Sequence, residues 1–273
     1  RHSYNQIIYL FIIYVYFKIK NIYYSMNKII ISFIFTFLAG LSTLLGTIFI
    51  FFKKDKNKNI LISSLAFASS VMLTVSICDL IPESISLLKS NNQGIIVIII
   101  SFISMIVGII ISMLIDKYLP SNNNDNLYKV GIISMVAIIL HNIPEGIATF
   151  LASSTNTTLG LSLTLAIAMH NIPEGISISI PIYYSTKSRK KAFLYTLISA
   201  LSEPFGALLA YLFLYRIINN LIMGILLSLI AGIMTHISIC ELLKESLSYK
   251  NKKLTIIFFL TGVAFMLFYI ILT

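Results

Sequence analysis

Eight long apolar runs, separated by short polar breaks, constrain the fold of this chain more than any other feature of its sequence. A helix needs about 20 consecutive apolar residues to cross a bilayer, and its backbone groups must bond within the helix because lipid offers them no partners. We therefore predict an all-α integral membrane protein with eight transmembrane helices. The predicted spans are residues 29–52, 60–88, 94–119, 129–153, 159–185, 192–215, 220–247 and 254–272.

The composition excludes the other broad classes of protein. Only 11% of the 273 residues are charged and 58% are hydrophobic, whereas a soluble domain has roughly 25% charged residues and a disordered chain has few apolar ones. Cys78 and Cys240 lie within apolar runs and form no metal-binding or disulfide pattern. No polar stretch is long enough for a separate soluble domain.

A further apolar stretch, residues 7–24, precedes the first predicted span. It could be a ninth span, but we expect residues 1–25 to be an N-terminal hydrophobic appendage, either a targeting segment or sequence upstream of a start at Met26. Residues 26–273 then form the eight-span domain.

The basic residues predict the orientation of the spans. We attribute the net charge of +10 to this orientation in a lipid bilayer and predict no nucleic-acid partner. The connections after spans one, three, five and seven contain 14 Lys and Arg residues, and the other connections contain two. Because positive charge is retained on the cytosolic side, both ends of the eight-span core are predicted to lie outside the cytosol.

One heptapeptide, His-Asn-Ile-Pro-Glu-Gly-Ile, occurs twice, at residues 141–147 and 170–176. Each copy lies near the middle of an apolar run. The offset of 29 residues equals one helix and one short loop, so we expect the copies on adjacent antiparallel helices. Residues at i and i+4 share one helical face, so each copy turns its histidine and its glutamate to the same side.

Two such helices facing each other provide two imidazole nitrogens and two carboxylates, from His141, Glu145, His170 and Glu174. This ligand set suits Zn²⁺ or another divalent ion such as Fe²⁺, Mn²⁺ or Co²⁺. A glutamate can bridge two ions, so a mid-membrane binuclear metal site between spans four and five is a reasonable geometry. Because carboxylates are costly in lipid, two identical motifs argue against a purely structural role.

Three further polar residues lie near this position. Asn142 and Asn171 follow the histidines and are turned about 100° around the helix, so they approach a second position next to the first. Glu203, midway along span six, either reaches the same position or is a structural carboxylate with its own hydrogen bonds.

The prolines and glycines of the repeat act on the backbone. Pro144 and Pro173 lack an N–H group, and we expect each to bend its helix and to free the carbonyl four residues earlier. Gly146 and Gly175 permit close approach of a neighbouring helix beside the bend. Transporters build ion sites at such irregular helices in mid-membrane.

Four other polar residues flank the predicted site. Asp79 and Glu83 lie toward the outer end of span two, and His236 and Glu241 lie in the inner half of span seven. They are candidates for a permeation path, and interfacial or helix-capping roles are equally open.

The paired His-Asn-x-Pro-Glu-Gly motifs resemble those of the ZIP family of divalent-metal transporters, in particular its prokaryotic-type zinc uptake branch. Residues 181–193 and the segment Ser-Glu-Pro-Phe-Gly-Ala-Leu at 202–208 are similar to the family's passage from the fifth to the sixth span. The resemblance covers about residues 28–272 and does not include residues 1–25.

The resemblance implies an eight-helix fold with both termini outside, and a homodimer that moves metal by alternating access or an elevator-like motion. It also implies a binuclear site between spans four and five. By position, the ligands of the transported ion would be His141, Glu145, His170 and Glu174. The ligands of a second ion, with the glutamates shared, would be Asn142, Asn171 and Glu203. Asp79 would lie near the outer entrance, and His236 and Glu241 toward the cytosolic exit.

Three features depart from the family's pattern. The third loop has no histidine cluster, Cys240 precedes Glu241 where an acidic residue is expected, and His170 stands where some members have a glutamine. The first feature puts metal sensing through that loop in doubt. The additional nitrogen ligand weakens a claim for zinc alone.

The leading hypothesis is a secondary transporter, not an enzyme, that moves Zn²⁺ into the cytosol across a plasma or organelle membrane, with Fe²⁺, Mn²⁺, Co²⁺ and Cd²⁺ as further candidates. The alternative is an intramembrane metal-dependent hydrolase with a metal-activated water. Against it, the chain has no His-Glu-x-x-His sequence, and no residue stands out as a general base. A metal sensor or scaffold would need an exposed signalling domain, and no stretch of this sequence predicts one.

Overall fold

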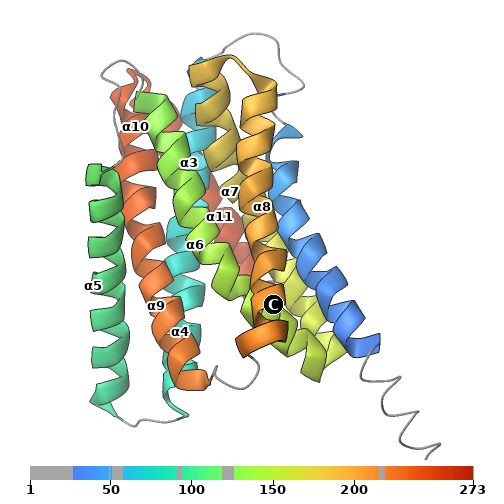
Figure 1. Cartoon of the computed structure of the whole chain (residues 1–273). Helices are drawn as coiled ribbons and strands as arrows, with labels where there is room; N and C mark the ends of the chain where they lie inside the picture. Colours follow the sequence, from blue (N-terminus) through green and yellow to red (C-terminus); the bar gives the residue numbers. More distant parts are fainter. Residues whose placement is uncertain are drawn as a thin grey trace, which may run out of the picture.

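The computed structural model describes residues 27–48, 50, 58–90, 94–118, 126–214 and 219–272. The regular elements in these ranges are all helices, and they stand side by side in one elongated bundle (Figure 1). The all-helical prediction is therefore confirmed. Residues 1–25, which we predicted to be an appendage, lie outside the described part of the chain.

The first residue of each long helix lies within three residues of the first residue of the corresponding predicted span. The first is Asn27–Leu45, and the end of its predicted span lies outside the described residues. The π-helical segments η1, η2 and η3 in spans two, six and seven were not predicted by the apolar pattern. In chain order the other elements are α3 (Lys58–Val75), η1 (Ser76–Leu80), α4 (Ile81–Leu88), α5 (Ile95–Tyr118), α6 (Asn126–Thr155), α7 (Thr157–Thr186), α8 (Arg189–Leu209), η2 (Ala210–Leu214), α9 (Asn220–His236), η3 (Ile237–Leu243), α10 (Lys244–Ser248) and α11 (Lys252–Leu272).

Seven helices in the described part of the chain are long and apolar enough to cross a membrane. The remaining long helix, α7, has 30 residues and carries His170, Asn171 and Glu174 in its middle. These side chains are buried, so they face protein rather than lipid. Both α6 and α7 continue as helices through Pro144 and Pro173.

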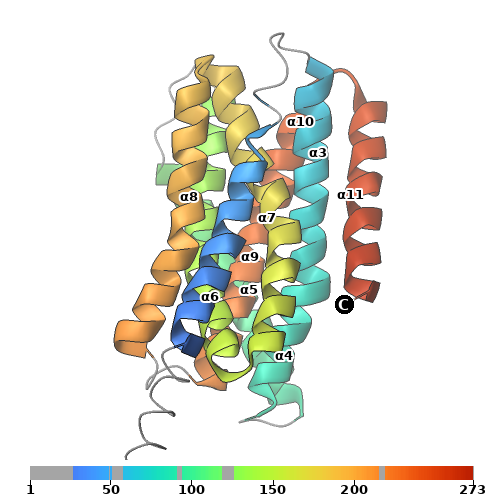
Figure 2. The same cartoon turned by 90° about the vertical axis from the view of Figure 1, so that its right-hand side faces the viewer.

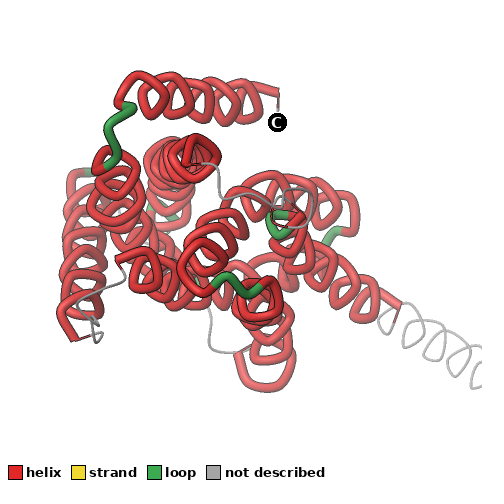
Figure 3. The backbone as a smooth tube through the Cα atoms, turned by 90° about the horizontal axis from the view of Figure 1, so that it is seen from above, coloured by secondary structure: helices red, strands yellow, loops and turns green. Residues whose placement is uncertain are grey.

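The helices pack in two groups. In the first group, α6 packs along α7 and α8, and helix 27–45 lies between α7 and α8 (Figure 2). In the second group, α4 and α5 pack on α9, and α11 packs on α3. The main contact between the groups is that of α3 with α7. Seen from above, α11 lies along one edge of the molecule (Figure 3).

A one-residue connection places α6 beside α7. Asn156 separates the two helices, and its side-chain oxygen accepts bonds from the backbone N–H groups of Thr158 (2.9 Å) and Leu159 (3.3 Å). This cap satisfies donors that have no partner in the first turn of a helix. So short a connection makes the helices antiparallel, as predicted. It also brings the two heptapeptides to the same level, since His141 and His170 lie at nearly equal distances along the chain from Asn156.

Glycines let the helices of the first group approach closely. A side chain at Gly146 would overlap the backbone of Glu203, and one at Gly206 would overlap the backbone of α6. Gly175 makes the same kind of contact with Thr43 of helix 27–45. The predicted role of Gly146 and Gly175 in helix packing is confirmed. Because these two glycines each follow a glutamate of the repeat, the close contacts occur at the level of the predicted site.

The two ends of the bundle differ in charge. Helices α3, α6, α8 and α11 all begin at the same end (Figures 1 and 2). Helix 27–45 begins at the opposite end, toward which α11 runs. The first of these ends is the one that the distribution of basic residues predicts to face the cytosol. Its basic residues include Lys58, Lys129, Lys187, Arg189, Lys190, Lys191, Lys250, Lys252 and Lys253.

Substitution of Gly146 by valine is expected to destabilise the protein, because the new side chain must displace the backbone of Glu203. Overpacking of this kind costs about 1–3 kcal/mol, so we expect a lower melting temperature for the detergent-solubilised protein. Ser162→Val is the control, because Ser162 lies on α7 and is exposed. A Gly146→Val variant that melts at the wild-type temperature would contradict the close packing of α6 and α8.

Candidate metal centre

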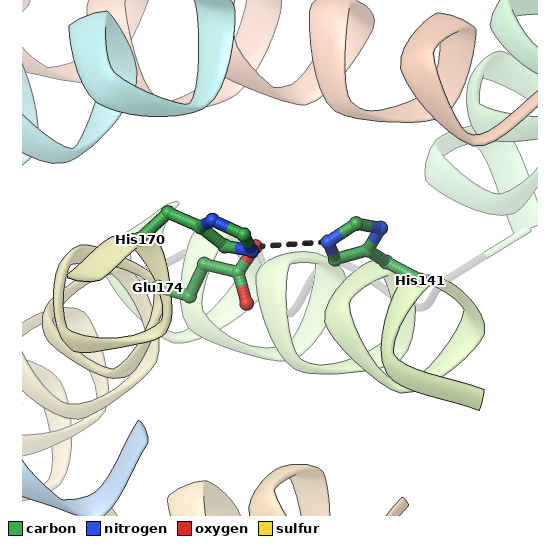
Figure 4. Close-up of side chains that lie close together, drawn as sticks. All are labelled: His141, His170 and Glu174. Carbon is green, nitrogen blue, oxygen red and sulfur yellow. Dashed lines mark ion pairs between the residues drawn. The ribbon is translucent and has the colours of Figure 1, made fainter. Parts of the chain in front are cut away.

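Four side chains of the repeat converge between α6 and α7. His141 comes from α6, and His170 and Glu174 come from adjacent turns of α7 (Figure 4). One potential ligand atom from each of these three residues lies within 4.8 Å of the other two. The Nε2 atom of His141 is 3.4 Å from Oε2 of Glu145 and 3.5 Å from Oε1 of Glu174. The predicted convergence of the two motifs is therefore present in the structure.

Glu145 connects the two histidines. Its Oε1 atom is 2.8 Å from Nε2 of His170, which is a hydrogen bond between the two helices. Its other oxygen faces His141, so one carboxylate spans two imidazole rings whose centres are 6.1 Å apart. The i, i+4 spacing predicted that each histidine shares a face with the glutamate of its own helix. The contacts of His170 with Glu145 and of His141 with Glu174 arise only from the packing of α6 on α7.

Two separations in this cluster suit a tetrahedral divalent ion. Zinc–ligand bonds of about 2.0–2.2 Å place the ligand atoms of a four-coordinate site roughly 3.3–3.6 Å apart. The distances from His141 Nε2 to Glu145 and to Glu174 fall in that range. Two imidazole nitrogens with carboxylate oxygens form a ligand set for Zn²⁺ and related transition-metal ions.

The cluster is buried and leaves many polar atoms without hydrogen-bond partners. None of the four residues is more than 8% exposed. An unsatisfied buried polar group costs roughly 1–3 kcal/mol, so such groups are rare and their concentration in one place indicates a binding site. In these four residues, the atoms without a hydrogen-bond partner are Nδ1 and Nε2 of His141, Oε2 of Glu145, Nδ1 of His170, and Oε1 and Oε2 of Glu174.

Asn142 and Asn171 are held in equivalent ways by neighbouring helices. The side-chain amide of Asn142 donates to the Ser199 carbonyl of α8 (3.4 Å), and that of Asn171 donates to the Ala39 carbonyl of helix 27–45 (3.0 Å). Asn171 also donates to Oε2 of Glu203 (3.0 Å). Glu203 therefore accepts a hydrogen bond with Oε2, whereas its Oε1 atom has no hydrogen-bond partner. The Oδ1 atoms of Asn142 and Asn171 also have no partner.

Asp79 and Glu83 lie on one side of the cluster. Asp79, in η1, is exposed and interacts electrostatically with His170 and Glu145. Glu83, one turn further along the chain, interacts with Asp79. The structure thus brings Asp79 within electrostatic range of the predicted site, and Glu83 within range of Asp79.

His236 and Glu241 lie apart from the cluster and near Asp116, which the sequence pattern did not identify as a candidate site residue. The Nδ1 atom of His236 is 2.9 Å from the hydroxyl of Ser112 in α5. Both His236 and Glu241 interact electrostatically with Asp116, which also forms an ion pair with Lys129 of α6 at 2.7 Å. In the sequence, Asp116 stands just before a polar break between two apolar runs. Acidic residues are common at such interfacial positions, so the sequence did not single it out.

The sequence pattern also did not reveal two buried hydroxyl groups near the cluster. Thr43 of helix 27–45 and Ser199 of α8 are fully buried, and their hydroxyl oxygens have no hydrogen-bond partner in the described structure. Serine and threonine are frequent in these helices and usually bond to a carbonyl of the preceding turn. Nothing in the sequence therefore distinguished these two residues from the others.

The fold and the cluster define a class of protein, namely a multi-pass helical membrane protein with buried potential ligands for a divalent cation. The pattern of the ZIP zinc transporter family matches residues 121–270, which is more than half of the chain. The chain therefore belongs to the ZIP zinc transporter family, as its paired motifs indicated. Members of this family are transporters, so the protein is a transporter and not an enzyme.

Similar proteins occur in several bacteria. The zinc transporter ZupT of Clostridium perfringens is 38% identical over an alignment of 275 positions, which covers 89% of this chain and 95% of that protein. ZupT of Chlorobaculum parvum is 40% identical over an alignment of 251 positions, which covers 84% of this chain and 92% of that protein. ZupT of Campylobacter jejuni is 33% identical over an alignment of 280 positions, which covers 89% of this chain and 96% of that protein. The similarity thus extends over nearly the full length of each relative.

Purified protein is expected to bind Zn²⁺ through the cluster. Replacement of His141 or His170 by alanine removes one of the four predicted ligands, and we expect it to weaken Zn²⁺ binding at least about tenfold, or roughly 1.4 kcal/mol. Isothermal titration calorimetry of the detergent-solubilised variants measures this change. Ser162→Val is the control, because Ser162 is exposed on α7 and lies outside the cluster. Equal affinities for all three variants would contradict the assignment of the ligands.

Proposed function

We propose that the protein imports Zn²⁺ into the cytosol as a secondary transporter, and that His141, Glu145, His170 and Glu174 bind the transported ion. The observation that carries this proposal is the group of buried, unpartnered imidazole and carboxylate atoms in the middle of the bundle. Ionisable groups are expensive inside a membrane, and they mark ion pathways for that reason. The zinc transporters to which the chain is 33–40% identical support zinc as the ion.

A second cation position adjoins the first in this proposal. Its oxygen ligands are Asn142, Asn171 and Glu203, and the carboxylates of Glu145 and Glu174 are shared between the two positions. The unpartnered oxygen on each of the first three residues supports this assignment. Mixed nitrogen and oxygen ligands do not select a single metal, so Fe²⁺, Mn²⁺, Co²⁺ and Cd²⁺ are further candidates as cargo.

Transport in this proposal is driven by the metal gradient and the membrane potential. The sequence contains no glycine-rich phosphate-binding loop that would couple ATP. A divalent ion gains about 4.6 kcal/mol for each 100 mV of inside-negative potential. The basic end of the bundle faces the cytosol and both ends of the eight-span core lie outside it, in a plasma or organelle membrane. The protein acts as a homodimer, as the family resemblance implies.

The two groups of helices provide a basis for alternating access. The proposed metal ligands all lie on α6, α7 and α8, in the first group. The second group is held together separately, for example by the hydroxyl of Ser228 in α9, which is 2.5 Å from that of Ser84 and 2.6 Å from that of Ser101. We propose that the first group moves along the second and exposes the metal to each side in turn.

Polar residues on both sides of the site extend this path. Asp79, at the edge of the cluster, and Glu83 form the outer approach. His236 and Glu241, near Asp116, form the route to the cytosol. The electrostatic interactions of Asp79 with the cluster, of Glu83 with Asp79, and of His236 and Glu241 with Asp116 support this order.

An intramembrane hydrolase is not favoured, because the chain belongs to a family of transporters. The His–Glu pair is also duplicated, so neither carboxylate is set apart as a general base. A hydrolase would retain its metal tightly, whereas the proposed function requires that bound metal exchanges with metal in solution.

Zn²⁺ uptake into vesicles reconstituted with the protein is expected to saturate with external Zn²⁺ and to increase with an inside-negative potential. His141→Ala and Glu174→Ala are expected to reduce uptake to the level of protein-free vesicles, because each removes a ligand of the transported ion. Ser162→Val, which changes an exposed residue of α7, is expected to transport normally. Wild-type uptake by both site variants would contradict the proposed site.

Competition between metals tests the selectivity of the same site. Unlabelled Fe²⁺, Co²⁺ or Cd²⁺ is expected to reduce uptake of labelled Zn²⁺, because these ions accept imidazole and carboxylate ligands. Mg²⁺ and Ca²⁺ at the same concentrations are expected to have little effect, since they prefer oxygen ligands and Mg²⁺ loses its water reluctantly. Strong inhibition by Mg²⁺ would show that the imidazoles do not contact the ion.

A further inference from the structure

We infer that the hydroxyl groups of Thr43 and Ser199 take part in cation binding, at the position formed by Asn142, Asn171 and Glu203. This inference rests on the proposed function and adds two residues to its site. Thr43 and Ser199 belong to the two helices that flank α6 and α7, and both are completely buried. Their hydroxyl oxygens have no hydrogen-bond partner in the described part of the chain.

Thr43 and Ser199 differ from other buried hydroxyl residues of the same helices. On helix 27–45, Thr36 donates to a carbonyl four residues earlier at 2.8 Å. On α8, Thr196 does the same at 2.9 Å, and Ser202 donates to a carbonyl three residues earlier. Such internal bonds are the usual way for a helix to satisfy a buried hydroxyl. Without one, Thr43 and Ser199 each keep a costly unsatisfied group.

Two other side chains occupy the carbonyl that would usually accept the hydroxyl of Thr43. This is the carbonyl of Ala39, four residues earlier, and it accepts the hydroxyl of Ser42 and the side-chain amide of Asn171, the latter at 3.0 Å. Ala39 and Thr43 share one face of their helix, and the backbone of Thr43 contacts Gly175, one turn after Asn171. Thr43 therefore lies beside the stretch of α7 that carries Asn171 and Glu174.

Ser199 has the corresponding place on α8. Its carbonyl accepts the side-chain amide of Asn142 at 3.4 Å. Ser199 also precedes Glu203 by one helical turn, so both residues lie on the same face of α8. The unpartnered hydroxyl of Ser199 is therefore next to Asn142 and on the face that presents Glu203 to the site.

The duplication of the motif thus extends to its surroundings. In each half, an asparagine donates to a backbone carbonyl of a flanking helix, its own oxygen stays free, and an unpartnered hydroxyl lies at that carbonyl or one turn beyond it. A position surrounded by oxygens suits a harder divalent ion than the histidine-containing position does, through direct ligation or through bound water. Its oxygens are Oγ1 of Thr43, Oδ1 of Asn142, Oδ1 of Asn171, Oγ of Ser199 and Oε1 of Glu203.

The test compares removal of the hydroxyl with its retention. Thr43→Val keeps the side-chain shape and removes the hydroxyl, Thr43→Ser keeps the hydroxyl, and Ser199→Ala removes it on the other helix. Thr36→Val and Thr196→Val are matched controls, because both threonines are buried on the same helices and bond to their own backbone. Isothermal titration calorimetry of the full-length protein with Zn²⁺ and with Mn²⁺ measures the affinities and the number of ions bound.

We expect Thr43→Val and Ser199→Ala to weaken the weaker of the two binding steps about threefold to tenfold, as for the loss of one polar contact. The loss should be larger for Mn²⁺ than for Zn²⁺, because Mn²⁺ favours oxygen ligands. Thr43→Ser is expected to restore wild-type binding, and the two control variants are expected to bind as the wild type does.

Three outcomes would overturn the inference. Wild-type isotherms for both Thr43→Val and Ser199→Ala would exclude the hydroxyls from the site while leaving the proposed function intact. An equal loss for Zn²⁺ and Mn²⁺ that Thr36→Val and Thr196→Val reproduce would assign the hydroxyls a structural role. Failure of the wild-type protein to bind or transport Zn²⁺ would overturn the proposed function and this inference with it.

Discussion

The burial of ionisable groups within a membrane is the constraint on which the rest of this structure depends. Four such side chains meet between α6 and α7, and each would be costly in lipid on its own. They offset this cost together, because Glu145 lies against both imidazoles and Glu174 lies against His141. The attraction between such groups is strong in a low dielectric only when their geometry is close. The same convergence of side chains would let them bind a divalent ion together at the proposed site.

Close helix packing provides that geometry. Lipid supplies no hydrophobic force between helices, so their association depends on tight contact and interhelical hydrogen bonds. Gly146 and Gly175 allow backbone contact directly beside Glu145 and Glu174. Asn171 then links three helices, since its amide bonds both to helix 27–45 and to Glu203 of α8. The packing that stabilises the first group of helices is therefore also what assembles its polar centre.

The charges near the basic end of the bundle have a different role from those at the centre. The ion pair between Asp116 and Lys129 joins α5 of the second group to α6 of the first. Both side chains are partly exposed, and pairs of this kind contribute little, about 0–1 kcal/mol. A contact this weak can break and form again at little cost in the motion that we propose for the two groups of helices, unlike the buried pairs of the centre.

The sequence by itself determined the helices and which residues share a face, because both depend on neighbours along the chain. The lengths of the apolar runs predicted the positions of the eight spans. The i, i+4 spacing predicted that His141 shares a helical face with Glu145 and that His170 shares one with Glu174. Only the tertiary structure decided that His170 bonds to the glutamate of the other helix, that the Ala39 carbonyl holds Asn171, and that Thr43 is left without a partner. These contacts join residues up to 132 positions apart. They depend on how closely and at what level the helices meet, which no local periodicity of the chain encodes.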